Sequence, residues 1–238
     1  MTIEYPKTFV LVHGMSHGGW CWVKVADRLR ALGHKVFTPT LTGVGERSHL
    51  MSADISLDTH IMDVVNVIKW ERLDDVVLCG HSYGGWPVSG AVEHVPDQIA
   101  SIVYLDAYMP EDGQCGLDIQ SPESRAGVEK AIAAGDISRP AGSAARFGVT
   151  GDDLDWVDDL LTPQPIGVSL QPIKMTGARD RVAKKTYILA ADYNSPAFTA
   201  YYEKLNNDPN WQVYSLPCQH DVMIEMPDEL AKILIEVA

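Results

Sequence analysis

The sequence feature that most constrains the fold is the junction in "VVLCGHSYGGW", residues 76–86, where an apolar run ends on a serine between two glycines. The run from Val76 to Cys79 is typical of a buried strand, and the small residues after Ser82 are typical of a helix that packs closely on a sheet. A sharp turn from strand to helix strains its central residue and leaves no room for side chains at the flanking positions. The junction therefore predicts a hydroxyl exposed above the sheet edge, at the amino-terminus of a helix.

Apolar runs alternate with helical patterns over most of the chain. Helical periodicity is found within residues 25–32, 57–68 and 227–237. Strands are expected at Thr8 to Val12, within 34–41, at 75–80, at Ile102 to Leu105, and within 184–193 and 211–217. This alternation predicts an α/β fold with a mostly parallel central sheet of about six strands flanked by helices.

Residues 112–180 interrupt the alternation. They contain no convincing strand, but they hold short helical stretches such as "GDDLDWVDDLL" among scattered prolines and glycines. The segment is too long for an ordinary loop. We therefore expect a helical cap insertion at 112–180, over a core made of residues 1–111 and 181–238.

Charge and composition limit the partners of the chain. The formal net charge of -13 argues against nucleic acid and against an anionic membrane surface, because both require a basic patch. No apolar run approaches the ~18 residues of a membrane span, and the amino-terminal segment lacks the basic and apolar regions of a signal peptide. The four cysteines form no C-x-x-C pair. We expect no metal and no cofactor, reduced cysteines, and a cytoplasmic protein that acts on a small molecule and for which a homodimer would be unsurprising.

A serine hydroxyl needs a neighbouring base to act as a nucleophile. His220 is the best candidate, because it follows the last predicted strand and precedes the final helix, and loops at the carboxyl ends of parallel strands gather in one place. His81 lies in the turn itself, but its side chain is expected to point away from the hydroxyl, and His13 is assigned a structural role. The alternative for His220 is a surface loop. Four further histidines lack this placement: His17, His34, His60 and His94.

The base in turn needs an acid that orients it, and two aspartates follow predicted strands between Ser82 and His220. Asp106 ends the run "VYLD", and Asp192 ends the run "ILAAD". Asp106 is flanked by apolar and small residues, where an unpaired carboxylate would be costly to bury and a partner imidazole would offset that cost. We favour Asp106, with Asp192 as the alternative.

Two backbone N–H groups are candidates for an oxyanion hole. One belongs to Tyr83, directly after the serine, and the other to Met15 in the loop "HGMSHGGW" that follows the first strand. Gly14 would let the backbone of this loop approach the serine. Trp20, Trp22 and Trp86 are candidates for the wall of a substrate pocket, with core packing as the alternative.

The stretches "FVLVHGMSHGGWCW", "GHSYGG", "YLDAYMP" and "QHDVMIEMPDELA" together resemble the α/β-hydrolase superfamily. Within it, the chain is similar to the small esterase and hydroxynitrile-lyase group, which includes plant methylesterases. The resemblance covers residues 7–110 and 184–238. It implies an α/β-hydrolase fold, Ser82 as nucleophile, His220 as base, and Met15 and Tyr83 as oxyanion donors.

The chain departs from this group at two positions. In the plant esterases the acid follows the penultimate strand, at a position that aligns here with Tyr193, one residue after Asp192. In the haloalkane dehalogenases of the same superfamily the acid often follows the preceding strand, where Asp106 lies. The lyases of the group carry a lysine directly after the catalytic histidine, whereas this chain has Asp221 there.

These observations predict a serine hydrolase that cleaves a small carboxylic ester or lactone through an acyl-enzyme, with Ser82, His220 and Asp106 as its triad. Two alternatives remain open at this point. One is a carbon–carbon lyase on the same scaffold, with His220 as its base. The other is a small-molecule receptor with a hydrolase fold, because a fold does not determine a function.

Overall fold

The computed structural model describes residues 6–238, so the expectation that no signal peptide is present concerns residues that partly lie outside the described range. Its strands are β1 Thr8–Val12, β2 Lys35–Phe37, β3 Val76–His81, β4 Ile99–Leu105, β5 Ser138–Arg139, β6 Gln164–Pro165, β7 Lys184–Ala190 and β8 Gln212–Leu216. Its α-helices are α1 Val23–Ala31, α2 Leu57–Trp70, α3 Gly85–His94, α4 Pro122–Ala133, α5 Asp152–Leu160, α6 Ala178–Arg181, α7 Pro196–Leu205, α8 Val222–Glu225 and α9 Pro227–Glu236.

Six of the strands form one central sheet in the order β2-β1-β3-β4-β7-β8. Every neighbouring pair in this sheet is parallel, which confirms the predicted fold class. The strand order reverses at β1, because the chain goes from β1 to β2 on one side and then to β3 on the other. In open α/β sheets, ligands bind outside the carboxyl ends of the strands near such a reversal.

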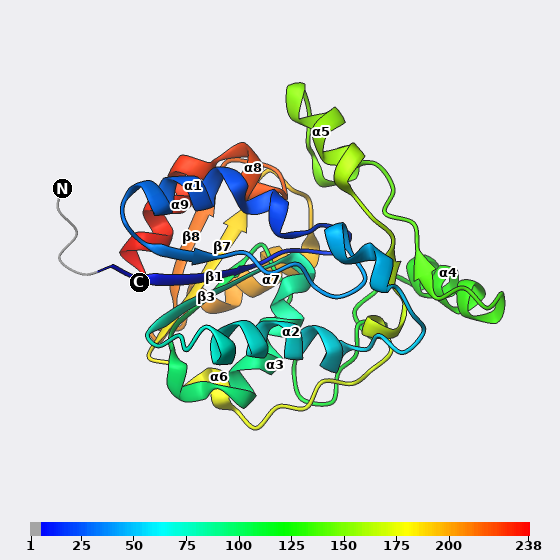
Figure 1. The fold of residues 1–238 in the computed structure, drawn as a ribbon, viewed down its shortest axis with the longest axis horizontal. Coiled ribbons are helices and arrows are strands. Elements are labelled where there is room, and N and C mark those ends of the chain that lie inside the picture. Colours follow the sequence, from blue (N-terminus) through cyan, green and yellow to red (C-terminus); the bar gives the residue numbers. More distant parts are fainter. Residues whose placement is uncertain (1–5) are drawn as a thin grey trace.

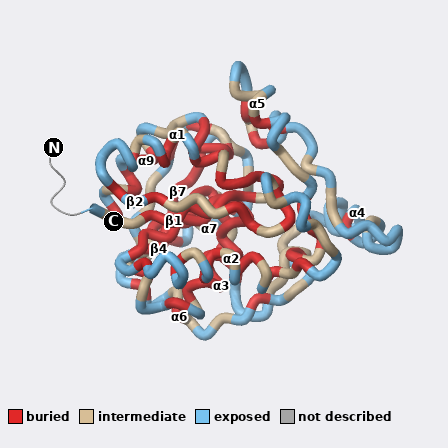
Figure 2. The backbone as a smooth tube through the Cα atoms, viewed as in Figure 1, coloured by how far each residue is buried: buried red, intermediate tan, exposed pale blue. Residues whose placement is uncertain are grey.

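Helices cover both faces of the sheet (Figure 1). The strands alternate their side chains between two apolar clusters, so that Val10 and Leu78 belong to one cluster and Leu11 and Cys79 to the other. The first cluster packs against α2, α3 and α7, and the second against α1 and α9. Buried residues are concentrated in the sheet and on the helix faces turned toward it (Figure 2). This two-sided core explains why the central strands read as continuous apolar runs.

The segment between β4 and β7 is organised differently from the rest. It contains α4, α5 and a sheet of two short antiparallel strands, β5 and β6, that the sequence did not predict. Each of these strands has two residues, too few for a periodic pattern to form. In α4 and α5 the buried residues are Val128 and Val157, and both helices project from the body of the molecule (Figures 1 and 2).

No helix within residues 6–238 is both long enough and apolar enough to cross a membrane.

Candidate active site

Ser82 lies at the turn between β3 and α3, with a left-handed φ of 53°. The two glycines of the motif make this turn possible, because an added Cβ at Gly80 would lie 2.6 Å from the carbonyl oxygen of Gly84. An added Cβ at Gly84 would lie 2.8 Å from the carbonyl oxygens of Val12 and His13. The strained serine and its closely packed neighbours are the features expected for this junction.

A continuous chain of hydrogen bonds links three side chains at the carboxyl ends of the strands. The Oγ of Ser82 lies 2.8 Å from Nε2 of His220, and Nδ1 of His220 lies 2.6 Å from Oδ2 of Asp106. Ser82 follows β3, Asp106 follows β4, and His220 follows β8. All three side chains are buried. The structure therefore brings together the serine, histidine and favoured aspartate that the sequence singled out.

The carboxylate of Asp106 is held firmly in place. Its φ is 41°, its backbone N–H donates to the carbonyl of Ile188, and its Oδ1 accepts a hydrogen bond from the backbone N–H of Ala190. Oδ2 is left to accept a hydrogen bond from Nδ1–H of the His220 imidazole. Asp192, the alternative acid, is exposed, and its backbone N–H donates to the carbonyl of Cys218.

Aromatic rings surround the imidazole of His220. Tyr193 stacks on it with the ring centroids 4.4 Å apart, and Phe198 lies nearly parallel to it at 5.5 Å. The ring of Phe147 approaches at 5.9 Å. His81 points away from the hydroxyl of Ser82, as expected, and its Nε2 lies 3.0 Å from the backbone carbonyl oxygen of His220. These contacts restrict the imidazole to one orientation.

The loop after β1 approaches the serine closely. An added Cβ at Gly14 would lie 2.9 Å from the ring of His81 and 3.0 Å from the Cβ of Ser82. His13 holds this loop in place through two hydrogen bonds. Its Nδ1–H donates to the carbonyl of Gly14, and its Nε2 accepts a hydrogen bond from the backbone N–H of Leu41. Burial lowers the pKa of His13 to about 3, so this imidazole is neutral and structural.

Tyr83 is anchored by its hydroxyl. The phenol lies 2.9 Å from Nδ1 of His60, and Nε2 of His60 donates to the carbonyl of Thr42. Burial lowers the pKa of His60 to about 4, so the neutral ring accepts a hydrogen bond from the Tyr83 phenol at Nδ1. This bond fixes the start of α3, where the backbone N–H of Tyr83 follows the serine.

A second buried histidine–aspartate pair lies behind the first. Nε2 of His17 lies 3.1 Å from Oδ2 of Asp221, and both side chains are buried. Burial alone would lower the pKa of His17, but the charge of Asp221 and the hydrogen bond to it outweigh burial and raise that pKa. Burial alone would raise the pKa of Asp221, yet the charge of His17 lowers it. The pair therefore consists of an imidazolium and a carboxylate.

This pair joins the two loops that carry the site. Nδ1–H of His17 donates to the carbonyl of Met15 at 2.8 Å, while Asp221 directly follows His220 in the chain. No role was predicted for His17, because it does not follow a predicted strand directly. The available signal was its place in the loop "HGMSHGGW", two residues after the candidate oxyanion donor.

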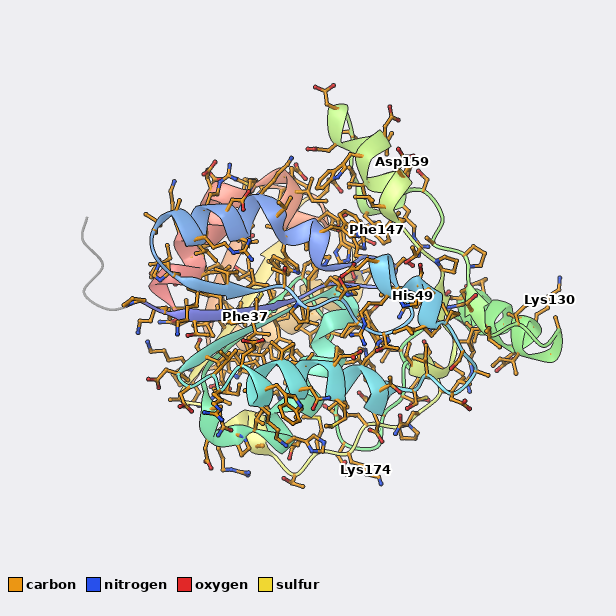
Figure 3. All side chains as sticks on the ribbon, in the orientation of Figure 1. Phe37, His49, Lys130, Phe147, Asp159 and Lys174 are labelled. Carbon is orange, nitrogen blue, oxygen red and sulfur yellow. The ribbon has the colours of Figure 1, made fainter. Side chains whose placement is uncertain are left out.

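A cavity of about 240 Å³ opens above Ser82, close to the lower end of the range for small-molecule pockets. Its floor includes Met15, Ser82 and Tyr83, and residues from the 112–180 segment form much of its wall. One wall residue, Phe147, lies between α5 and the body of the molecule (Figure 3). Of the three candidate tryptophans, Trp86 contributes to the lining, while Trp22 packs in the core. Among residues 6–238, no three His, Cys, Asp or Glu side chains gather as metal ligands would.

The comparisons with known proteins agree with this architecture. A model of the alpha/beta hydrolase family matches residues 9–233. The carbendazim hydrolyzing esterase of Nocardioides sp. (strain SG-4G) is 40% identical, over 94% of this chain and 96% of the relative. Methylesterase 4 of Arabidopsis thaliana is 38% identical over 44% of this chain and 41% of its own length.

One solved structure has the same fold over nearly the whole chain. It is an extracellular alpha/beta-hydrolase from a Paenibacillus species, described as structurally and functionally homologous to tobacco salicylic acid binding protein 2. The superposition has a TM-score of 0.83 at 24% identity and covers 98% of this chain and 99% of the other. This structure shares the fold, and the match to the family model and to the esterase relatives confirms the resemblance to the small esterases.

Proposed function

This chain belongs to the alpha/beta hydrolase family and is an ester hydrolase, and we propose that it cleaves a small carboxylic ester through Ser82, His220 and Asp106. The observation that carries this proposal is the unbroken hydrogen-bond chain from the Ser82 hydroxyl to the Asp106 carboxylate at the floor of the cavity. The relative that is 40% identical is named as an esterase that hydrolyses carbendazim, which supports a small ester-like substrate for this chain.

The first half-reaction acylates the serine. The Oγ of Ser82 attacks the ester carbonyl carbon while its proton passes to Nε2 of His220. Asp106 accepts the Nδ1–H of the imidazole, which fixes the tautomer and stabilises the imidazolium. The backbone N–H groups of Met15 and Tyr83 stabilise the oxyanion. When the tetrahedral intermediate collapses, the alcohol leaves with the proton from Nε2, and the acyl group remains on Ser82.

The second half-reaction releases the acid. A water molecule gives a proton to Nε2 of His220 and attacks the acyl carbonyl, through a second tetrahedral intermediate in the same oxyanion hole. Collapse of this intermediate returns the proton to Oγ of Ser82 and frees the carboxylic acid. Neither half-reaction includes a redox step or requires a cofactor.

We further propose that residues 112–180 act as a cap that shapes the substrate pocket over a core of 1–111 and 181–238. The support is that the cavity wall draws on both parts, from Met15 and Tyr83 in the core to Gln120 and Phe147 in the segment. A cytoplasmic location and a homodimer remain predictions from the sequence. Cell fractionation and light scattering would test them.

The test of the function uses p-nitrophenyl esters of two to eight acyl carbons, with the wild type and Ser82→Ala. We expect turnover of at least one ester and a loss of about 10⁴-fold or more in kcat for the variant, because nucleophilic attack is removed. Folding of the variant is checked by circular dichroism. Turnover by Ser82→Ala at the wild-type rate would overturn the serine mechanism. Cleavage of a carbon–carbon bond without consumption of water would favour the lyase alternative.

A further inference from the structure

Two residues of the 112–180 segment, Arg139 in β5 and Gln164 in β6, lie next to the cavity above Ser82. Arg139 and Gln164 are direct partners in this antiparallel pair, so their side chains project from the same face of the ribbon. Both residues line the cavity above Ser82. The ribbon therefore presents a guanidinium and an amide to the same space.

Within residues 6–238, the guanidinium of Arg139 has no carboxylate partner. Its Nε is buried and makes no hydrogen bond to any described residue. Its other contacts are to neutral groups, with Nη1 at 3.4 Å from Oε1 of Gln120 and Nη2 at 3.3 Å from Sδ of Met15. A half-buried cation with a buried, unpaired Nε and contacts only to a distant amide and a thioether is poorly compensated.

The amide of Gln164 also presents an unused donor. Its Oε1 accepts the backbone N–H of Ser16 at 2.8 Å, and this bond fixes which end of the amide is the oxygen. The remaining Nε2 is buried and has no partner among the described residues. Two buried donors without protein acceptors therefore belong to residues that line the same pocket, where one bound acceptor could satisfy both.

The charge of the cavity points in the same direction. Among its lining residues within the described range, Arg139 and Arg146 are charged and none is acidic, although the chain carries a net charge of -13. Burial, followed by the nearby charge of Arg146, lowers the pKa of Arg139. The charged side chains that line this pocket are therefore all cationic in a protein with a negative net charge, which favours the binding of an anion there.

We propose that Arg139 and Gln164 form a carboxylate-binding subsite, so that the preferred substrate carries a carboxylate in addition to its scissile ester. This inference rests on the proposed ester hydrolysis at Ser82. The planar fork of the guanidinium matches the two oxygens of a carboxylate, and Nε2 of Gln164 supplies a further donor. The subsite lies close to the candidate oxyanion hole. The backbone N–H of Met15 is a candidate oxyanion donor, and the sulfur of the same residue contacts the guanidinium of Arg139.

The test compares charged and neutral esters of matched size. Monomethyl esters of succinate, glutarate and adipate, paired with the dimethyl esters, place the carboxylate on the acid side. The pair 4-acetoxybutyrate and butyl acetate places it on the alcohol side. Initial rates in a pH-stat give kcat/KM for each compound. The measured quantity is the ratio of kcat/KM for the charged ester to that for its neutral partner.

Four variants separate the subsite from general effects of the cap. Arg139→Gln removes the positive charge. Arg139→Lys keeps the charge but loses the planar guanidinium that can donate to both oxygens of a carboxylate. Gln164→Glu keeps the acceptor for Ser16 while it replaces the free donor by a carboxylate beside Arg139. Arg125→Gln is the control, because Arg125 is an exposed arginine of α4 that pairs with Glu129 and does not line the cavity. Melting temperatures verify that each variant folds.

We expect the wild type to favour the charged member of at least one pair. Arg139→Gln should lower the charged-to-neutral ratio by about 30-fold or more, since truncating one partner of a buried charge pair has effects of that order. Gln164→Glu should lower the ratio similarly, Arg139→Lys less, and Arg125→Gln by less than twofold. If Arg139→Gln does not fold, the charged-to-neutral ratio of kcat/KM for Gln164→Glu tests the subsite.

Two results would overturn the subsite. One is a wild-type preference for the neutral ester in every pair, and the other is a ratio that neither Arg139→Gln nor Gln164→Glu changes. Failure of the proposed function looks different, because then the wild type hydrolyses neither the charged nor the neutral esters. A separate binding readout is inhibition of p-nitrophenyl acetate hydrolysis by free glutarate, which we expect to weaken at least 30-fold in Arg139→Gln.

Discussion

The ring of Tyr193 lies stacked on the imidazole of His220, with 4.4 Å between ring centroids and 21° between ring planes. Tyr193 lies in the loop after β7, where the resemblance to plant esterases would place the acid of the triad. In this protein an aromatic ring packs on the face of the imidazole, and the carboxylate reaches Nδ1 of His220 from the loop after β4. The loop after β7 therefore packs on the face of the imidazole, while the loop after β4 accepts the hydrogen bond from its Nδ1–H.

The first prediction concerns this stack. We expect Tyr193→Ala to lower kcat about 2- to 10-fold, because an aromatic pair contributes about 0.5–1.5 kcal/mol beyond its buried area. Tyr193→Phe keeps the ring and should recover most of the loss. The measurement is kcat and KM on a p-nitrophenyl ester for both variants. An equal loss in Tyr193→Phe would assign the effect to the phenol and contradict the stacking role.

The second prediction identifies the acid. Asp106→Asn should lower kcat by about 10⁴-fold, because an amide next to Nδ1 of His220 stabilises the wrong tautomer of the imidazole. The amide oxygen can still accept the backbone N–H of Ala190, so the loop should keep its shape. Asp192→Asn is the matched control, and its exposed side chain should change kcat less than twofold. The measurement is the steady-state kcat of the wild type, Asp106→Asn and Asp192→Asn on one p-nitrophenyl ester.

The reverse outcome has a definite meaning. If Asp192→Asn abolished activity and Asp106→Asn did not, the loop after β7 would have to rearrange when substrate binds. The exposed Asp192 would then replace Asp106 as the acceptor at Nδ1 of His220.

The third prediction tests the close contact between α3 and the loop after β4. An added Cβ at Gly85 would lie 1.9 Å from the carbonyl oxygen of Tyr108, whose backbone N–H bonds to the carbonyl of Ser82. Gly85→Ala should therefore destabilise the fold by about 3 kcal/mol or more, as severe overpacking does. Gly127→Ala in α4 is the control, because nothing lies within 4 Å of its added Cβ, and it should stabilise by about 0.5–1 kcal/mol. Urea unfolding of both variants measures the difference, and equal stability would contradict the clash.

The central sheet and the strand-to-helix turn were predictable from the sequence because each depends on a local pattern. The apolar run from Val76 to Cys79 indicates a strand buried on both faces, and the glycines around Ser82 indicate a turn without room for side chains. The placement of His220 followed from topology, since parallel strands end on one side of the sheet.

The residues that the sequence did not reveal act through contacts distant in the chain. Arg139 and Gln164 lie in strands of two residues, which are too short for any periodic pattern. His17 and Asp221 are 204 positions apart, and neither has a motif that indicates the other. A polar residue whose role depends on one remote partner is not distinguished in sequence from a solvated one.

The last prediction concerns the buried pair of His17 and Asp221 and its dependence on pH. The pKa of His17 is raised from 6.5, so its contribution to stability is fully present below pH 6.5 and is lost as the pH rises through the raised value. The pKa of Asp221 is lowered from 3.8, so its contribution is present above pH 3.8 and is lost as the pH falls through the lowered value. The pair therefore stabilises the fold most between pH 3.8 and 6.5.

His17→Gln tests this directly, because it leaves the Asp221 carboxylate buried without its cation. We expect the free energy of unfolding to fall by about 3–5 kcal/mol at pH 6, the usual effect of breaking a buried ion pair, and the difference from wild type to shrink as the pH rises to 9. His49→Gln is the control, since His49 is exposed, and its effect should stay within about 0.5 kcal/mol. Urea unfolding at pH values from 5 to 9 gives the free energy of unfolding against pH for the wild type, His17→Gln and His49→Gln. A difference between wild type and His17→Gln that stays constant with pH would show that the pKa of His17 is not raised, and one that grows as the pH rises from 5 to 7 would show that His17 packs as a neutral ring. Either result would require the ionic pair to be abandoned.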